Sequence, residues 1–454
     1  MTEIKKENKM GTMPITKLLL TMSGPAIFSM LIQALYNIVD SIFVAQLGQS
    51  ALAAVTLVFP IQMLIISVAV GTGIGINSLI SRRLGAKRQE DANKAATTGL
   101  FLGIFNWIPF AIFGIFFATW FLSMFSNNPY IIKEGGDYLR IVTIGSIFVM
   151  TGINSEKIIQ STGNMILPMI TIITGALVNV VLDPILIFGL LGAPKLGVAG
   201  AAVATVIAQC ASMMVGVTFL LKKNLPVKVN FSNGIFNGRT IKEIYGVGGP
   251  SIIMQAIGSF MLFGINGILA SFSETAVAVM GAYSKLQSFV FMPCFGVNQG
   301  SLPVMGYNYG AQNGKRLMET FKKAGIMAIS IMTFGLILFQ TIPVVLLSMF
   351  NANEDMIEIG TIALRAISLS FIPAAIGIVS AGLFQATGHG MISLWGSLIR
   401  QLVGILPLAI LFGKIGGVSL VWWAFPLAEV FGLIYSITMI RYLFKTKLKR
   451  LGDV

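Results

Sequence analysis

The chain has 454 residues, of which 55% are hydrophobic and only 11% charged, and its mean hydropathy is +0.85. Soluble domains carry about 25% charged residues, so the composition excludes a soluble protein and predicts an integral membrane protein. The net charge of +14 does not indicate a nucleic-acid partner, because the basic residues lie in short runs between apolar segments. Such runs set membrane topology and contact anionic lipid head groups.

Twelve long apolar segments predict twelve transmembrane helices, since a membrane span needs roughly 20 mostly apolar residues. In chain order we expect helices at 15–44, 51–82, 94–122, 132–159, 166–190, 196–221, 241–270, 276–307, 316–347, 357–386, 391–413 and 418–444. The corresponding domains are a cytoplasmic tail (1–14), a six-helix bundle (15–221), a cytoplasmic linker (222–240), a second six-helix bundle (241–446) and a cytoplasmic tail (447–454).

The second half of the chain repeats motifs of the first half at one fixed offset. This offset is the one that relates Gly24 to Gly249, and every repeat counterpart named below is found with it. Motifs of the first half recur in the second as Gly24-Pro25 and Gly249-Pro250, Gly85-Ala86 and Gly310-Ala311, and Thr162-Gly163 and Thr387-Gly388. Six spans per copy is an even number, so both copies cross the membrane in the same direction and are related by a pseudo-twofold axis along the membrane normal. We therefore expect an all-α membrane protein with twelve transmembrane helices in two parallel, pseudo-symmetric six-helix bundles, which is a design for alternating access.

The basic residues predict the orientation. Of the 31 Lys and Arg residues, 24 lie in the termini and in segments on one side of the predicted membrane, and only Lys133, Lys195 and Lys414 lie in the opposite loops. Because Lys and Arg are enriched in cytoplasmic loops, both termini and the linker are expected in the cytoplasm. The protein is then a multi-pass protein of the plasma membrane.

Acidic residues inside predicted spans are costly and are functional candidates for that reason. Asp40 in the first span and Asp183 in the fifth are both expected in the outer half of the bilayer, at similar depth. Asn179 lies one helical turn before Asp183, and Tyr36, Asn37 and Asp40 form a polar stripe on the first span. Glu156 in the fourth span lies near the cytoplasmic end beside Lys157, where a cap, an ion pair or a transport role are all open.

Two carboxyl groups close together in an apolar environment favour sharing a proton, which they release when water or a cation arrives. Alternatively, the Asp40 and Asp183 carboxylates with Asn and Thr oxygens form a hard-oxygen site suited to Na⁺. A third interpretation is a buried polar network that only fixes helix packing. Because the same carboxylates suit either ion, the coupling ion is expected to be H⁺ or Na⁺. No cofactor or other metal is expected.

Pro25 in the first span removes a backbone hydrogen bond and permits a kink. Its repeat partner Pro250 favours an architectural bend, whereas a bend that responds to protonation of Asp40 is the functional alternative.

The second half does not copy these acids. The counterpart of Asp40 is Ile265, and the intramembrane charges there are Lys285, Arg365, Arg400 and Glu429. We expect Glu429 to pair with Arg400 or Lys285, and cation chemistry to be confined to the first bundle.

A central substrate cavity is expected from polar and soft residues on otherwise apolar spans. The candidates are Gln33, Gln62, Met63, Asn154, Glu156, Gln255, Asn266, Gln287 and Asn298. The 24 methionines and 32 phenylalanines supply adaptable surface that suits small organic cations. A single histidine, two distant cysteines and the lack of a phosphate-binding loop argue against an enzyme or an ATP-driven pump. The expected partners are small organic cations and membrane lipids, and the protein is expected to be monomeric.

The chain resembles the multidrug and toxic compound extrusion (MATE) transporters, nearest to the bacterial MepA-type branch in or near the DinF-like group. The matching stretches are Ser23-Gly24-Pro25, Asp40, Gly85-Ala86, Gln160-Ser161-Thr162-Gly163, Asn179 with Asp183-Pro184, and Gly197 to Thr205.

This resemblance implies a drug antiporter driven by H⁺ or Na⁺. It also implies that Asp40, Asn179, Asp183 and Thr205 line a first-bundle cation site and that Pro25 bends the first span. One feature departs from the pattern: some family members have a carboxylate within the seventh span, but residues 241–270 contain only Glu243, at the cytoplasmic edge. A competing hypothesis is a flippase for lipid-linked precursors, which would need a basic cavity that Lys285, Arg365 and Arg400 would supply.

Overall fold

Helices are the structure expected for a chain in lipid, because the hydrocarbon interior offers no partner for backbone N–H and C=O groups. The computed structural model describes residues 8–230, 237–350 and 352–446, and within these ranges it contains helices and no strands. The helices of the first half are α1 (Lys9–Thr12), α2 (Ile15–Ala45), α3 (Gln49–Gly85), α4 (Gln89–Ser123), α5 (Pro129–Ser161), α6 (Ile166–Phe188), η1 (Leu190–Gly192) and α7 (Val198–Lys222).

The second half begins after the linker and contains more breaks. Its helices are α8 (Gly238–Ala270), α9 (Glu274–Gly310), α10 (Gly314–Thr341), α11 (Pro343–Ser348), α12 (Glu354–Ser368), α13 (Phe371–Ala386), α14 (Gly390–Leu398), the π-helix η3 (Ile399–Ile405), α15 (Leu406–Val421) and α16 (Ala424–Thr446).

Ten helices of the described chain are long and apolar enough to cross a membrane, and the bent pair α12–α13 makes an eleventh. The remaining predicted span, 276–307, coincides with α9, which has 37 residues but a more polar composition. The all-α membrane fold is therefore confirmed. Large apolar side chains such as Phe116, which is 72% exposed, cover the outside of the helices, as expected for contact with lipid tails.

Three spans of the second half differ from the predicted single helices. Residues 316–347 divide at Ile342, and residues 357–386 bend by 47° between Ser368 and Phe371. Pro343 and Pro373 follow these breaks closely, and proline cannot donate the helical hydrogen bond. The span predicted at 391–413 continues through α15 to Val421, with a kink at Gly416 and Gly417, whose backbone angles are not helical.

The repeat is present in the backbone conformation. Lys87 and Gln312 both have φ of 57°, each two residues after the corresponding helix end, and Gly163 and Gly388 have φ of 89° and 86°. Side-chain packing repeats as well, because Leu122 fills the space above Gly135 and Leu347 fills that above Gly360. Two copies of one packed module account for these coincidences.

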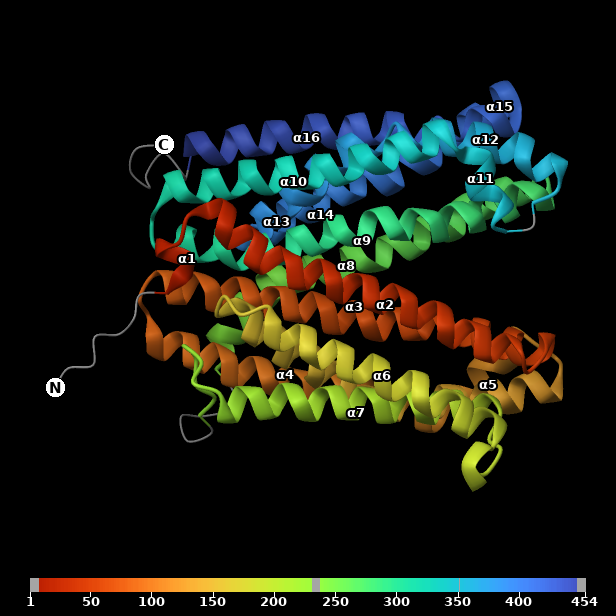
Figure 1. Ribbon diagram of the computed structural model, residues 1–454, viewed down its shortest axis with the longest axis horizontal. Coiled ribbons are helices and arrows are strands. Elements are labelled where there is room, and N and C mark those ends of the chain that lie inside the picture. The colour runs from red at the N-terminus through yellow and green to blue at the C-terminus, as the bar shows by residue number, and fades with distance from the viewer. Residues whose placement is uncertain (1–7, 231–236, 351, 447–454) are drawn as a thin grey trace. The chain divides into compact units, whose positions relative to one another are not determined.

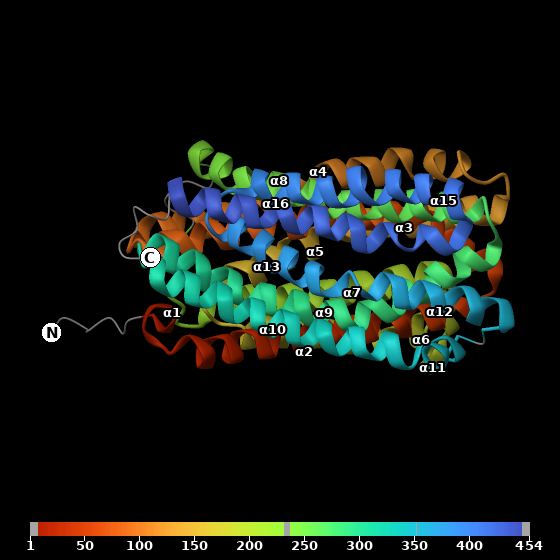
Figure 2. The same cartoon turned by 90° about the horizontal axis from the view of Figure 1, so that it is seen from above.

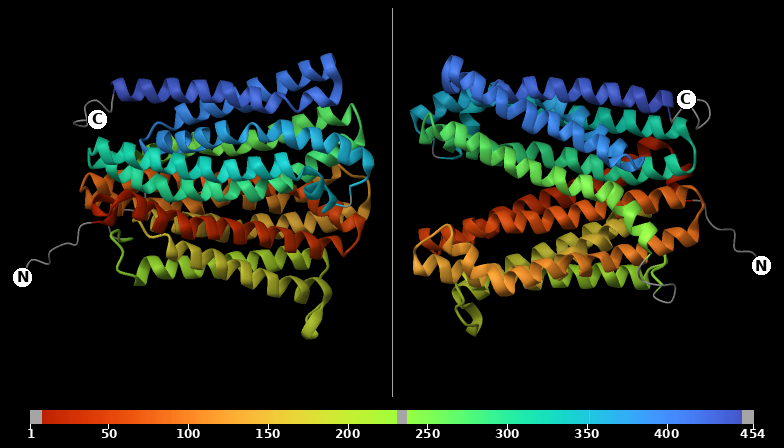
Figure 3. Two further views of the ribbon diagram at one scale, coloured as in Figure 1. Left: turned by 45° about the horizontal axis from the view of Figure 1, so that its top comes forward. Right: turned by 180° about the vertical axis from the view of Figure 1, so that it is seen from behind.

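Contacts divide the chain into two compact units, one of residues 31–252 and one of residues 1–30 with 253–454. In the first unit α3, α4, α5, α6 and α7 run side by side (Figure 1), and a core around Val58, Leu122 and Leu139 joins the first three of them. In the second unit the axes of α9, α10, α13 and α16 lie roughly parallel to one another (Figure 2). The turn η1, which follows α6, projects away from the neighbouring helices (Figure 3), with Leu191 91% exposed.

These units do not coincide with the two halves of the chain, because each unit includes a helical segment from the other half. The first part of α2 belongs to the unit built mainly by the second half, and the first part of α8 belongs to the unit built by the first half. The division into bundles at 15–221 and 241–446 stays a prediction.

The left-handed turns make a testable prediction. Replacing Gly163 or Gly388 by alanine should destabilise the protein by about 1 kcal/mol, because a side chain at positive φ is strained. The control is Gly267→Ala within α8, where a Cβ meets nothing within 4 Å and helix propensity should add roughly 0.5–1 kcal/mol. Thermal unfolding of the purified protein in detergent measures both; the same sign of change at the turn and helix positions would contradict the assignment.

Candidate functional site

The two predicted acids of the first half come together at one place. Asp40 lies in the second part of α2 and Asp183 on α6, and their carboxyl groups are close enough to interact electrostatically. Asp183 is fully buried, and Asp40 is half-buried. α6 carries no other ionisable side chain, so the carboxyl group of Asp183 is the costly group that this helix brings into the bundle.

Asn179 and Thr205 complete a polar cluster around Asp183. The Asn179 side chain lies one turn earlier on α6, and its Nδ2 donates to Asp183 Oδ1 at 3.3 Å. The same Nδ2 lies 3.5 Å from Thr205 Oγ1 on α7. Both residues are buried. Three helices, α2, α6 and α7, therefore contribute to one cluster of side-chain oxygens.

The closeness of the Asp40 and Asp183 carboxyl groups limits which protonation states suit the pair. Ionised carboxylates are acceptors only, so two carboxyl groups can hydrogen-bond only when one of them holds a proton. Asp183 Oδ2 and Asn179 Oδ1 are buried and have no donor among the described protein groups. These acceptor oxygens suit a shared proton or a hard cation.

Tyr138 on α5 is a fourth contributor that the sequence reasoning missed. It is 4% exposed, its hydroxyl accepts from Gln62 Nε2 at 3.1 Å, and it interacts electrostatically with Asp40 and Tyr36. A signal for it exists in the sequence, because the repeat position is Ala363. Asp40 shows the same signal, because its repeat position is Ile265.

The other members of the predicted stripe on α2 differ in their surroundings. Tyr36 is half-buried and interacts electrostatically with both acids. Asn37 and Gln33 have exposed side chains. Their roles in cation coupling and substrate binding stay predictions.

Glu156 contacts the neighbouring helix. Its Oε1 accepts from Thr171 Oγ1 at 2.9 Å, so it joins α5 to α6, while the neighbouring Lys157 donates from Nζ to Gln160 Oε1 at 3.0 Å. The arrangement has a clear structural purpose, and a transport role for Glu156 stays a prediction.

The remaining cavity candidates fall into both units. Gln62, Met63 and Asn154 lie in the first unit; Gln255, Asn266, Gln287 and Asn298 lie in the second. Asn154 is buried and donates from Nδ2 to the Gly99 carbonyl oxygen at 2.8 Å, which is a packing contact between α5 and α4. Their assignment to one substrate cavity stays a prediction.

Pro25 lies inside α2, which is helical without interruption from Ile15 to Ala45. The carbonyl oxygen of Pro25 accepts from Ser29 Oγ at 2.8 Å. A bend at Pro25 that responds to protonation stays a prediction.

The charges of the second half form a different arrangement. Arg400 Nη1 lies 3.3 Å from Glu429 Oε1, which is the expected ion pair, whereas Lys285 is exposed. Arg400 lies in the π-helix η3, which ends two residues before Pro407. Proline clashes with the carbonyl four residues before it, and the wider π turn relieves that clash.

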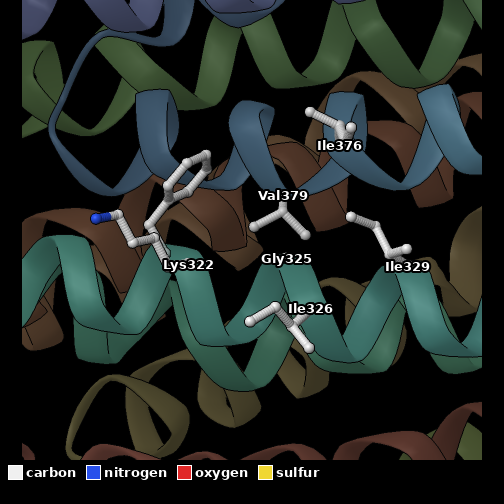
Figure 4. Close-up of a pocket in the computed structure, with 7 residues that line it drawn as sticks. Lys322, Gly325, Ile326, Ile329, Ile376 and Val379 are labelled. Carbon is white, nitrogen blue, oxygen red and sulfur yellow. The ribbon is translucent and has the colours of Figure 1, made fainter.

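A cavity of about 320 Å³ lies between α10 and α13 (Figure 4). Its walls are mainly apolar, from Phe321, Gly325, Ile326, Ile329, Ile376 and Val379, with Lys322 at one end. Its lining includes no acid and none of the predicted site residues. It therefore differs from the cation cluster in both place and chemistry.

A repeated all-helical membrane fold with a buried acid pair in one repeat only is the architecture of a secondary transporter. The MatE family profile matches residues 25–185 and 250–411, so the chain belongs to the MatE family of membrane transporters and is not an enzyme.

Two curated relatives and one solved structure illustrate the similarity. The chain is 25% identical to the multidrug export protein MepA of Staphylococcus aureus (strain MSSA476), over 96% of this chain and 95% of that protein. It is also 25% identical to a FAD transporter of Shewanella oneidensis, over 94% of each. A solved structure described as the outward-facing conformation of a multidrug resistance MATE family transporter matches with a TM-score of 0.91, at 26% identity, over 97% of this chain and 99% of that one.

The Arg400–Glu429 pair makes a prediction for stability. Changing Glu429 to Gln leaves the guanidinium of a largely buried pair, with side chains 23% and 12% exposed, without its counter-ion. We expect a loss of about 2–4 kcal/mol. The control Asp137→Asn breaks the Arg140–Asp137 pair, in which the side chains are 43% and 44% exposed, and should change stability little. Thermal unfolding checks both; equal losses would contradict the structural role of the buried pair.

Proposed function

We propose that this protein is a multidrug exporter that moves small organic cations out of the cell in exchange for H⁺ or Na⁺. The observation that carries the proposal is the buried polar cluster in which Asp183 lies beside Asp40, Asn179 and Thr205, with Asp183 Oδ2 lacking a donor among the described protein groups. Such a pair of acids favours holding a proton or a cation. Loss of the proton leaves two adjacent carboxylates, which repel one another unless a cation or water separates them. Proton occupancy is thereby coupled to the packing of α2 on α6.

Alternating access links this site to transport. The two parallel repeats supply two arrangements of the same helices, and a ligand shifts the balance between them only by binding one arrangement more tightly than the other. In the proposed cycle, drug binding favours deprotonation of the acid pair, and proton or Na⁺ entry from outside resets it. The residues Asn179 and Thr205 orient the acids, and Tyr138 with Gln62 closes the polar cluster toward α5 and α3.

The substrate class is supported by the relative MepA, whose name is that of a multidrug export protein. The cavity candidates Gln33, Gln62, Met63, Asn154, Gln255, Asn266 and Gln287 offer neutral polar and soft contacts suited to varied cations. We place the protein in the plasma membrane with both termini in the cytoplasm, from the distribution of basic residues.

An anionic substrate is the second candidate, since one relative is a FAD transporter. A phosphate-bearing substrate, including a lipid-linked precursor, needs free basic groups. Arg400 is engaged by Glu429, so fewer cations are available for that role. This observation favours organic cations over phosphorylated substrates.

The proposal predicts the behaviour of Asp183→Asn. The amide cannot exchange a proton, so efflux of a fluorescent cation from proteoliposomes should be abolished while thermal stability is retained. Asp137→Asn, the same substitution at a half-exposed acid of the first half, should leave efflux unchanged. Undiminished efflux by Asp183→Asn would remove these acids from the mechanism.

The coupling ion follows from the same vesicles under separately imposed gradients. A proton-coupled exporter responds to a pH gradient without Na⁺, and a sodium-coupled one responds to a Na⁺ gradient at equal pH. If added FAD competes with the dye, or if FAD is exported and the dye is not, the substrate is an anion and not an organic cation.

A further inference from the structure

Two pairs of glycines permit unusually close helix crossings. On α3, a Cβ at Gly71 would lie 2.6 Å from the backbone N of Ile252 on α8, and one at Gly75 would collide with the carbonyl oxygen of Ile244. Real Cβ atoms do not approach backbone atoms so closely. The spacing of four residues is the small-residue motif by which membrane helices bring their backbones together. α3 and α8 therefore meet along a seam that only glycine allows.

The second crossing has the same geometry at the repeat positions. On α9, a Cβ at Gly296 would lie 2.7 Å from Ile27 Cα on α2, and one at Gly300 would lie 2.7 Å from Ser23 N. Gly296 and Gly300 are the repeat counterparts of Gly71 and Gly75, and Ile252 is the counterpart of Ile27. Each seam joins a helix of one repeat to a helix of the other.

An ion pair closes the basic end of the α3–α8 seam. Arg83 Nη2 donates to Glu243 Oε2 at 2.9 Å, and its guanidinium also lies 3.5 Å from Thr240 Oγ1. The Arg83 side chain is only 8% exposed, whereas that of Glu243 is 37% exposed. Arg83 Nη1 also donates to the carbonyl oxygen of Asp91 at 2.7 Å, which fixes the guanidinium on its own repeat.

The N-terminal turn closes the corresponding end of the α2–α9 seam. Asn308, at the repeat position of Arg83, donates from Nδ2 to the Met10 carbonyl oxygen at 3.2 Å. Arg316, at the repeat position of Asp91, donates from Nη2 to the carbonyl oxygens of Met10 and Met13 at 3.2 and 2.8 Å. The Met10 side chain is fully buried. The two seams thus have equivalent locks made by different chemistry.

We propose that these two glycine seams are the cytoplasmic gate of the transporter, locked by Arg83–Glu243 at one and by the Met10–Met13 turn at the other. The inference rests on the proposed alternating-access function, because a cycle that opens to the cytoplasm must part helices of opposite repeats there. Both locks lie beside the basic segments Arg82–Lys94 and Lys315–Lys323, which mark the expected cytoplasmic side. Backbone contact makes each seam tight, and exposed Glu243 makes one lock breakable.

Cross-linking tests whether the seam must open. Arg83→Cys with Glu243→Cys, in a chain with Cys210 and Cys294 changed to Ala, places one thiol on each side of the α3–α8 seam, where the two native side chains meet at 2.9 Å. Linking the thiols with a short, reducible bifunctional thiol reagent should abolish dye efflux, and reduction should restore it. If the cross-linked protein exports dye as fast as the same protein after reduction, the proposal is overturned.

The matched control for this cross-link lies within one repeat. Gln340→Cys with Ser368→Cys, linked by the same reagent, joins α10 to α12 at a place where the native side chains meet at 2.9 Å. Because this contact does not cross from one repeat to the other, its cross-link should leave efflux intact.

Thiol labelling tests the locks without requiring transport. Ser23→Cys alone, fully buried at the α2–α9 seam, should react with a membrane-impermeant thiol reagent from the cytoplasmic side only when the seam opens. Glu243→Gln should raise that rate by about five-fold, since a partly exposed ion pair shifts an equilibrium by about that factor. Glu319→Gln, which breaks the exposed Lys323–Glu319 pair, is the control and should have no effect.

The two measurements separate the gate from the proposed function. Equal labelling rates in the Glu243→Gln and Glu319→Gln proteins would overturn the gate whatever the substrate is. Faster labelling with Glu243→Gln, together with an absence of dye efflux in every reduced protein, would uphold the gate and reject the organic-cation function.

Discussion

A carboxyl group buried among apolar helices needs a proton, a cation or a donor, and Asp183, which lies beside Asp40, has Asn179 as its donor on one oxygen only. These acids join the C-terminal part of α2 to α6, in the unit of residues 31–252. The N-terminal part of the same helix packs on α9 through Ser23 and Ile27, in the other unit. α2 therefore belongs to both units, and a continuous helix is a physical means of carrying a change at the acids to the packing at its other end.

Features that occur in both repeats build the frame of the molecule, whereas the candidate site occurs in one repeat only. Turns at Lys87 and Gln312, and glycine seams at Gly75 and Gly300, are present twice because both copies must build the same frame. The acid pair is present once, since Asp40 is matched by Ile265. Proline breaks and the π-helix occur only on the second copy's side of the described chain, which also holds the Arg400–Glu429 ion pair.

Much of this arrangement is predictable from sequence, because the cost of exposing polar backbone to lipid makes helix positions follow hydropathy. The first predicted span, 15–44, differs from α2 by one residue. A proline in a predicted span does not by itself predict a break in the helix. Pro25 leaves α2 unbroken, whereas Pro343 and Pro373 accompany breaks. Tyr138 was missed because nothing local distinguishes a site tyrosine from a packing one. The exchange of segments between units depends on which glycines contact a helix that is distant in the sequence. The hydropathy pattern along the chain does not show which glycines these are.

The exchange of segments also bears on how the chain is made. Gly71, Gly75 and Arg83 find their partners in residues 243–252, which are synthesised only after the first six spans are complete. Those six spans can enter the membrane as they leave the ribosome, but α3 keeps an open glycine groove until α8 is inserted. Final packing of the first unit therefore waits for the second half of translation. Neither half expressed alone contains all the parts of a finished unit, and separately expressed halves must find one another in the bilayer to complete their folding.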